Sequence, residues 1–250
     1  MFKFIITGAC GKMGKVIQSV VSERDDCEII AGVDKYNDGL RPFPVYESIS
    51  EVKEKADAVI DFSNPSLLDD LLNYCTETKT AVVIGTTGYD ECRKKQIKDA
   101  STKCPVFFTY NMSLGINLLA NLAKKATQIL GSDFDIEIVE AHHNQKIDAP
   151  SGTALMLADA INEELEMPAK YEYDRHVKRE KRTKNEIGMH SIRGGNIVGE
   201  HEIIFAGRDE IIKLSHSARS KEVFAVGAVN AAVFMADKDC GMYDMAELIK

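Results

Sequence analysis

The segment between positions 140 and 154 holds the residues best suited to chemistry. His142 and His143 follow a predicted strand, and Lys146 lies four residues beyond His142. Histidine exchanges protons near neutral pH, and a lysine ammonium can donate a proton or hold a carboxylate. Residues 151–153, Ser-Gly-Thr, begin a predicted helix whose free N–H groups and hydroxyls form an anion site. The segment therefore suits a substrate that carries a carboxylate and must be protonated.

Two other interpretations of this segment stay open at this point. Any one of its polar residues, taken alone, is more simply explained as part of a capped polar loop. A metal site would need a third ligand, and the remaining histidines show no metal-ligand spacing. We therefore predict no metal, and we favour the chemical interpretation because all the groups occur together.

A second candidate site lies at the N-terminus, where glycines at positions 8, 11 and 14 separate a predicted strand from a predicted helix. Such a turn can hold a pyrophosphate through backbone N–H groups and the helix N-terminus. Asp34 ends the next strand, 20 residues after Gly14, where an acid can accept hydrogen bonds from ribose hydroxyls. Lys35 could instead hold a 2′-phosphate, or it could be a solvated surface lysine. Asp34 could likewise be only a turn residue.

The elements that position these residues alternate between strand and helix through the first two-thirds of the chain. Apolar runs at 2–7, 28–33, 56–62, 80–84 and 106–109 predict buried strands, and 12–23 and 90–100 predict helices between them. This order is typical of a Rossmann-type doubly wound parallel sheet. Its strands end near the glycine turn and near the loop Gly85-Thr86-Thr87-Gly88, where ligands bind in such folds.

The pattern changes after residue 112, which predicts a second α+β domain with an open mixed sheet. Helices are predicted at 113–130 and 153–165, and strands at 134–141, 187–193, 196–206 and 210–218. Residues 36–44 and the charged stretch 170–184 are predicted to be loops. The helix at 221–236 could return to the first domain. We therefore predict a dinucleotide-binding domain from residues 1–112 and 220–250, and a substrate-binding and oligomerisation domain from residues 113–219.

The composition excludes several classes of protein. The 250 residues carry a net charge of -8, whereas a nucleic-acid binder should be basic. No apolar run is long enough for a membrane helix, and the N-terminus lacks a signal-peptide layout. The six cysteines form no C-x-x-C pair, which favours reduced thiols in a cytoplasmic protein. The basic stretch 175–184 could steer an acidic substrate, although charge runs are usually solvated loops.

The run from Glu137 to Ala154 resembles the signature of the 4-hydroxy-tetrahydrodipicolinate reductase family, formerly called dihydrodipicolinate reductases. The likeness extends to the N-terminal glycine turn, to 85–87, 109–112 and 199–201, and to 241–245, so it spans the chain. It implies reduction of a small cyclic dicarboxylate by NADH or NADPH, with loss of water, in lysine and diaminopimelate biosynthesis. It also implies a homotetramer, and residues 187–218 support this with strands that few helices can cover.

The resemblance assigns roles to individual residues. His142 would be the proton donor and acceptor, and Lys146 a proton donor. The substrate would be held by His143, Ser151, Gly152 and Thr153. The dinucleotide would contact Gly8, Ala9, Cys10, Gly11, Lys12, Met13, Asp34, Lys35, Gly85, Thr86, Thr87, Thr109, Tyr110, Asn111 and Met112. Cys10 stands where a glycine is common, so we expect a tighter phosphate turn.

Two rival functions remain open from the sequence. A non-catalytic NAD(P)-sensing protein would need the glycine turn but not the histidine and lysine segment. A different two-domain dehydrogenase, acting on aspartate or homoserine, would share the first domain but should lack the run from His142 to Ala154.

Overall fold

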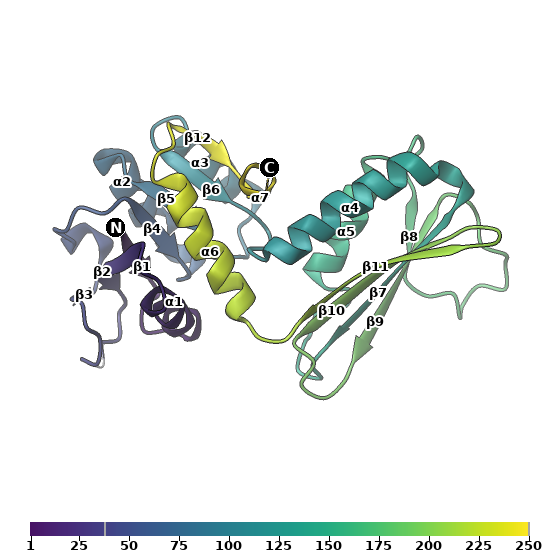
Figure 1. Ribbon diagram of the computed structural model, residues 1–250, viewed down its shortest axis with the longest axis horizontal. Coiled ribbons are helices and arrows are strands. Elements are labelled where there is room, and N and C mark those ends of the chain that lie inside the picture. Colours follow the sequence, from purple (N-terminus) through teal and green to yellow (C-terminus); the bar gives the residue numbers. More distant parts are fainter. Residues whose placement is uncertain (38, 250) are drawn as a thin grey trace. The chain divides into compact units, whose positions relative to one another are not determined.

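A computed structural model of the protein describes residues 1–37 and 39–249. The chain forms two compact units (Figure 1). The first unit comprises Met1–Leu114 and Lys221–Lys250, and the second comprises Gly115–Ser220.

The described part of the first unit is built on a seven-stranded parallel sheet in the order β12-β6-β5-β4-β1-β2-β3. The reversal of strand order beside β1 is the doubly wound arrangement, so the predicted fold class is confirmed. The strands are β1 (Phe2–Thr7), β2 (Cys27–Val33), β3 (Val45–Tyr46), β4 (Ala58–Asp61), β5 (Ala81–Ile84), β6 (Pro105–Phe108) and β12 (Gly241–Tyr243).

Helices cover both faces of this sheet, because its strands are apolar on both sides. Along β1, Phe4 and Ile6 pack into one core cluster and Ile5 into the other. The helices are α1 (Lys12–Ser22), α2 (Leu68–Thr78), α3 (Glu91–Ala100), α6 (Glu222–Met235) and α7 (Met245–Leu248), with single 3-10 turns at η1 (Ile49–Glu51) and η2 (Pro65–Leu67).

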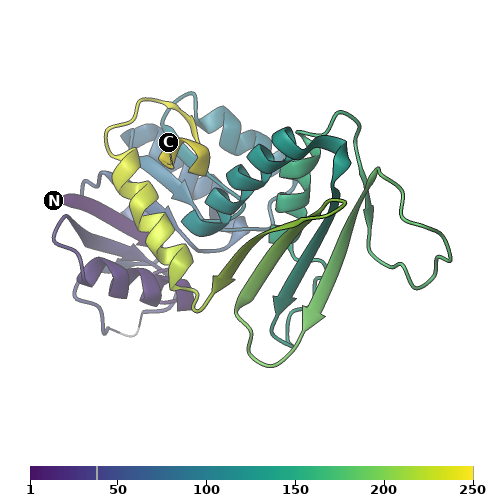
Figure 2. The same ribbon diagram turned by 45° about the vertical axis from the view of Figure 1, so that its right-hand side comes forward.

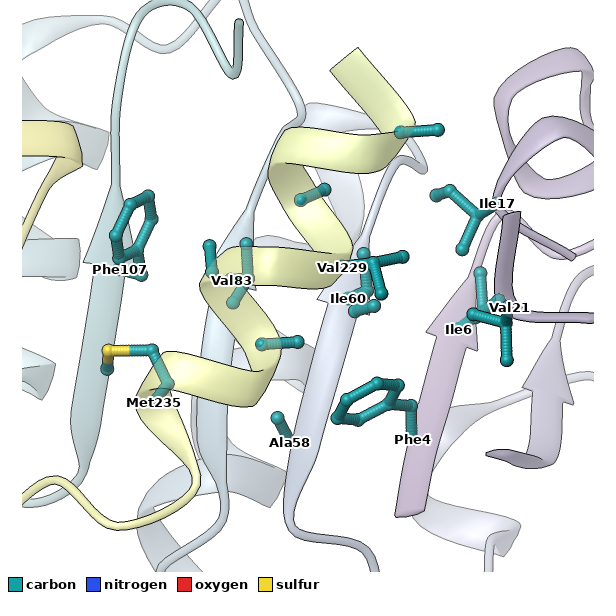
Figure 3. Packing of buried hydrophobic residues seen from close by; sticks show 14 of the residues in the cluster. Phe4, Ile6, Ile17, Val21, Ala58, Ile60, Val83, Phe107, Val229 and Met235 are labelled. Atoms are coloured by element: carbon teal, nitrogen blue, oxygen red, sulfur yellow. The ribbon is translucent and has the colours of Figure 1, made fainter. Parts of the chain in front are cut away.

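Helix α6 belongs to the first unit although it follows the second unit in sequence. It lies against β4 and β5, where Val229 packs with residues such as Ile60 and Val83 (Figure 3). Gly227 permits close approach, because a Cβ there would lie 1.7 Å from the carbonyl oxygen of Met112. The predicted return of this helix to the first domain is therefore confirmed.

The described part of the second unit contains a five-stranded mixed sheet in the order β11-β10-β7-β9-β8. Helices α4 (Leu114–Leu130) and α5 (Gly152–Asn162) cover one face (Figure 2), and their apolar side chains form a core with that face. The strands are β7 (Asp135–His142), β8 (Lys170–Glu172), β9 (Glu186–Arg193), β10 (Gly199–Ala206) and β11 (Ile211–Ala218), and η3 (Gly131–Asp133) precedes β7.

Three short strands and one short helix escaped the sequence prediction: β3, β8, β12 and α7. The prediction that 170–184 is irregular is wrong at β8, where a charged segment pairs with β9 in parallel. Only Tyr171 of β8 packs on the core, so three residues at a sheet edge give no periodic signal. The loop predicted at 36–44 has no helix or strand in its described residues, and residue 38 lies outside them.

Candidate functional site

The glycine turn of the first unit leads from β1 into α1. Gly8 has a φ of +74°, and a Cβ there would lie 2.3 Å from the carbonyl oxygen of Phe62. Gly14 packs against the turn itself, because its Cβ would lie 2.3 Å from the carbonyl oxygen of Gly8. Gly11 differs, since its Cβ would meet only that same oxygen, at 3.2 Å. The first and third glycines therefore shape the turn, while the second leaves its outer side open.

Asp34 holds this turn against the end of β2. Its Oδ2 accepts a hydrogen bond from the N–H of Cys10 at 2.9 Å, and its Oδ1 accepts one from the N–H of Tyr36 at 3.0 Å. Cys10 therefore contributes to the turn through its backbone. Each carboxylate oxygen keeps a second lone pair, so Asp34 can still accept hydrogen bonds from a ligand.

A cavity of about 630 Å³ opens at the carboxyl ends of β1, β2 and β4. Gly8, Gly11, Asp34 and Lys35, four of the residues predicted to contact a dinucleotide, line it. Its lining also includes polar groups that sequence analysis did not assign to the cofactor: Ser48, Ser63, Asn64 and Ser66. A glycine-walled cavity with an acid, a cation and several hydroxyls fits the adenosine half of a dinucleotide.

The loop Gly85–Thr87 does not line the cavity, but Thr86 supports its wall, because the Thr86 hydroxyl accepts a hydrogen bond from the N–H of Ser63 at 2.9 Å. Gly85 lies under the ring of Phe62, where a Cβ would approach within 2.4 Å. The buried carboxylate of Asp61 accepts hydrogen bonds from the hydroxyls of Thr7 and Ser63. The turn after β4 is thus tied to β1 and to the end of β5.

Other residues predicted to contact the dinucleotide do not line this cavity. Ala9 is buried, and its carbonyl oxygen accepts a hydrogen bond from Gln18. Lys12 and Met13 lie in the first turn of α1, and Thr87 is exposed beside Thr86. The segment after β6, Thr109, Tyr110, Asn111 and Met112, is held by internal contacts such as the N–H of Ser113 to Asn111.

In the second unit, strand register gathers one set of side chains at the ends of three strands. His142 on β7 lies opposite Arg193 on β9, and Glu140 lies opposite both Ser191 on β9 and His201 on β10. Alternate residues share a face, so Glu140 and His142 point the same way as Ile138 below them. The alternation of apolar and acidic residues over 134–141 predicts a half-exposed strand, and this prediction is wrong at Glu140, whose side chain is 1% exposed.

Glu140 is the centre of this set. Its Oε2 lies 2.6 Å from Nδ1 of His142, and Arg193 donates two hydrogen bonds, one to each carboxylate oxygen, at 2.7 and 2.8 Å. Its Oε1 also accepts the N–H of Ser151 at 3.1 Å. Burial opposes the charged form of Glu140. Hydrogen bonds from its neighbours, led by Arg193, outweigh this and lower its pKa to about 2.

His201 lies edge-on to His142, with 5.3 Å between ring centroids. Its Nε2 lies 3.1 Å from the hydroxyl of Ser151. Burial lowers the pKa of His201 to about 4, and the neighbouring charge of His142 acts in the same direction. His201 is therefore neutral near pH 7, so any positive charge on the two rings falls to His142.

Ser151 caps α5, because its hydroxyl accepts the N–H of Ala154 at 3.1 Å. Gly152 and Thr153 form the first turn of the helix, and Gly152 is exposed. Lys146 pairs with Asp148 at 3.0 Å, and its N–H donates to the carbonyl oxygen of His143. The structure thus brings the loop, the helix start and His142 together as the sequence analysis expected.

This arrangement can bind an anion and move a proton. The N-terminus of α5 is the positive end of its helix dipole and attracts anions, and Lys146 adds a cation whose partner, Asp148, is 58% exposed. His142 supplies an imidazole, which can both donate and accept a proton. Sequence reasoning missed Glu140, Arg193 and His201 as members of this site. Glu140 and His201 lie in segments that carry the family resemblance, 137–154 and 199–201, but no role was given to them there. The other signal was the two-residue spacing of Glu140 and His142.

The basic stretch 175–184 is a largely exposed loop, as predicted, and ion pairs anchor it to the sheet. Arg182 donates hydrogen bonds to Asp135 and Glu137, which anchors the stretch to β7. Arg175 pairs with Glu186, and Lys178 with Glu172. These partners neutralise much of the charge that could have steered a substrate.

In residues 1–37 and 39–249, no three histidine, cysteine or acidic side chains are grouped to hold a metal ion. Within the same ranges, no helix has the length and apolar character needed to span a membrane.

Comparison with known proteins matches both halves of the chain to one family. Residues 2–112 match the model of the dihydrodipicolinate reductase N-terminus, and residues 115–249 match that of its C-terminus. The chain is 51% identical over 250 residues to the 4-hydroxy-tetrahydrodipicolinate reductase of Caldanaerobacter subterraneus subsp. tengcongensis, covering 100% of this chain and 99% of that protein. It is 48% identical to the enzyme of that name from Clostridium novyi, with the same coverage.

A solved structure shares the fold along its whole length. It is the dipicolinate-bound dihydrodipicolinate reductase from Paenisporosarcina sp. TG-14, with a TM-score of 0.82 and 25% sequence identity. The alignment covers 100% of both chains.

Proposed function

The chain belongs to the dihydrodipicolinate reductase family, and we propose that it reduces 4-hydroxy-tetrahydrodipicolinate to tetrahydrodipicolinate, with loss of water. The reaction of this family depends on NADH or NADPH and belongs to lysine and diaminopimelate biosynthesis. The observation that carries the proposal is the cluster at the end of β7, where His142 and the capped start of α5 share the carboxylate of Glu140.

The first unit holds the dinucleotide in this proposal. Gly8–Met13 surround the pyrophosphate, Asp34 accepts hydrogen bonds from the adenosine ribose, and Lys35 lies where it can face a 2′-phosphate. The segments 85–87 and 109–112 complete the contacts. Support comes from the cavity beside Gly11 and Asp34, since a glycine wall allows the close approach that a pyrophosphate needs. Both NADH and NADPH are accepted.

The second unit binds the substrate and handles protons. The N–H groups of Gly152 and Thr153, with the Ser151 cap and His143, hold a substrate carboxylate. Lys146 donates as electron density builds on the ring, and His142 exchanges a proton. When bound, the nicotinamide supplies the hydride. The protein's own contribution is orientation, charge and a proton at a fixed position.

We propose further that residues 1–112 and 220–250 act as the dinucleotide-binding domain and residues 113–219 as the substrate-binding and oligomerisation domain. The second domain forms a homotetramer through the sheet face opposite α4 and α5, where Ile192 and Ile211 are 51% and 63% exposed. Light scattering should give a mass of four times 27.7 kDa, and a 27.7 kDa monomer at micromolar concentration would refute the tetramer.

The six free cysteines fit a cytoplasmic location.

The test is an NAD(P)H-oxidation assay in which the substrate is made enzymatically from pyruvate and aspartate semialdehyde. We expect oxidation that depends on both precursors, and binding of dipicolinate to the protein by calorimetry. An NAD(P)-sensing protein would bind the cofactor without oxidising it. A homoserine dehydrogenase would oxidise NAD(P)H with aspartate semialdehyde alone, without pyruvate, because that aldehyde is the oxidised form of homoserine. A dehydrogenase of aspartate would show no oxidation that depends on both precursors, but would turn over with aspartate.

A further inference from the structure

The proposed function gives Glu140 no role of its own. Its carboxylate nevertheless contacts both His142 and the start of α5, where a substrate carboxylate would bind. Glu140 lies two residues before His142 on β7, is 1% exposed, and contacts His142, Arg193 and Ser151. We propose that Glu140 is a positioning residue that keeps a proton on Nδ1 of His142, so that Nε2 is the atom that exchanges a proton with the substrate. This rests on the proposed role of His142.

The direction of the hydrogen bond follows from the charge on Glu140. Arg193 donates to both carboxylate oxygens, and its guanidinium is always protonated. The pKa of Glu140 is about 2, so the carboxylate is ionised at any working pH and can only accept. Nδ1 of His142, 2.6 Å away, must therefore be the donor. The neutral imidazole then has its free lone pair on Nε2.

The same carboxylate also places the anion-binding end of the site. Its Oε1 accepts the N–H of Ser151, the residue that caps α5. Arg193 extends the link by donating to the carbonyl oxygen of Asp148 at 2.7 Å, in the loop before α5. One buried ion pair thus fixes both the proton-exchanging ring and the helix start where a carboxylate docks. Such a third group, which orients a catalytic histidine, sets its tautomer and stabilises its charged form.

Gly199 on β10 provides the room for this orientation. A Cβ at Gly199 would lie 3.2 Å from Nε2 of His142, close enough to displace the ring by a few tenths of an ångström. The glycine therefore lets the ring lie over β10 with Nε2 unobstructed by a side chain at that position.

The other charged groups around the ring do not replace Glu140. His201 is neutral near pH 7 because its pKa is about 4, and burial also lowers the pKa of His216 beyond it. The positive charge of Lys146 disfavours protonation of His201, and Lys146 is itself paired with Asp148. Several polar groups face His142 from the elements packed around it. They are Glu140 on β7, Arg193 and Ser191 on β9, His201 on β10, His216 beyond it on β11, and Lys146 with Asp148 in the loop.

The experiment compares kcat against pH for the wild type, Glu140→Gln and Glu140→Asp. Loss of the carboxylate removes the partner of the imidazolium, so in Glu140→Gln the alkaline limb of the profile should move about one to three units to lower pH. The maximal kcat should fall about 10- to 100-fold, with NADH affinity unchanged. Glu140→Asp keeps the charge, so its limb should stay at the wild-type pH even if kcat falls.

Glu137→Gln is the matched control, because Glu137 lies on the same strand but contacts His190 and Arg182. Its pH profile should equal that of the wild type. An unshifted limb in Glu140→Gln, with or without a loss of kcat, overturns the inference. If His142→Ala keeps its kcat, the proposed role of His142 fails; if only the Glu140→Gln limb fails to move, the positioning role alone fails.

A measurement on the unaltered protein covers the case in which Glu140→Gln does not fold. Nitrogen-15 NMR of histidine-labelled wild-type protein reports which ring nitrogen carries the proton, with His142 identified by its missing signals in His142→Gln. We expect the neutral ring of His142 to carry its proton on Nδ1. A proton on Nε2 would overturn the inference.

Discussion

The cavity of the first unit and the histidine cluster of the second are built from different chemical groups. In the cavity, the decisive contacts are backbone atoms, such as the N–H of Cys10 on Asp34 and the open side of Gly11. In the cluster, they are buried side chains whose charges depend on one another, such as Glu140 and Arg193. The first site should therefore be sensitive to side-chain volume and the second to charge and pH.

The largest effect on the first region should come from Gly11→Val. Gly11 has φ −70° and ψ 175°, which any residue adopts, and its Cβ would meet only the carbonyl oxygen of Gly8. The fold should tolerate the change, but the side chain would occupy the approach to the phosphates. Losing two charge-assisted hydrogen bonds, at about 1.5 kcal/mol each, weakens NADH binding on the order of 100-fold.

Fluorescence titration with NADH measures this, and thermal unfolding checks the fold. The same change at Gly194, where a Cβ would meet no atom within 4 Å, should leave NADH affinity unaltered. Wild-type affinity in Gly11→Val would show that the pyrophosphate does not approach this turn.

The second region should instead lose stability in acid. The pKa of His201 is lowered from 6.5 to about 4 in the folded protein, so the folded state prefers the neutral ring. The contribution of His201 to the free energy of unfolding is fully present above pH 6.5. It is lost as pH falls towards 4, and the total loss is about 3 kcal/mol. Glu140, with its pKa lowered from 4.5 to about 2, extends the loss between pH 4.5 and 2.

Urea unfolding at successive pH values measures the slope of the free energy of unfolding against pH. His201→Gln should flatten it between pH 6.5 and 4, whereas His176→Gln, at an exposed position, should not. A wild-type slope in His201→Gln would mean that another group controls acid unfolding.

A smaller effect concerns the choice of cofactor in the first region. Asp34→Ala removes a carboxylate that repels a 2′-phosphate, so the kcat/KM ratio should shift towards NADPH by about tenfold. Lys35→Ala should shift it the opposite way. Steady-state kinetics with both cofactors decides this, and an unchanged ratio in Asp34→Ala would place that residue away from the ribose.

The smallest effect should come from the basic stretch of the second unit. Lys178→Ala breaks an exposed ion pair with Glu172, and such pairs contribute little to stability. Melting temperature and the salt dependence of kcat/KM should both stay at wild-type values. A clear drop in kcat/KM at low salt would show that the stretch steers an acidic substrate after all.

The two regions also differ in how far the sequence could predict them. The strand, turn and helix at 2–22 and the acid Asp34 follow from local apolar runs and glycine spacing, and the structure places them as expected. The polar lining at Ser48 and Ser63 comes from loops whose position depends on the folded sheet, so no local pattern indicated it.

In the second region, local pattern located His142, Lys146 and the Ser151 cap but not their partners. Arg193 lies 53 residues from Glu140, and the register of β9 on β7 brings the two together. His201 lies 50 residues from Ser151, and the two meet only because the start of α5 packs beside β10. The burial of Glu140 was not predicted, because acids are usually exposed. The guanidinium of Arg193, together with hydrogen bonds from His142 and from the N–H of Ser151, makes burial of its charge tolerable.

The most direct test of the claim that the first unit binds the cofactor and the second moves protons measures kcat and NADH affinity together. The variants are His142→Ala and Lys146→Ala. A general acid contributes on the order of 100- to 10,000-fold in rate, so kcat should fall within or near that range in each variant. NADH affinity should stay at the wild-type value, because neither residue belongs to the cavity of the first unit. Near-normal kcat in both variants, with only a lower melting temperature, would contradict the account and make the loop purely structural.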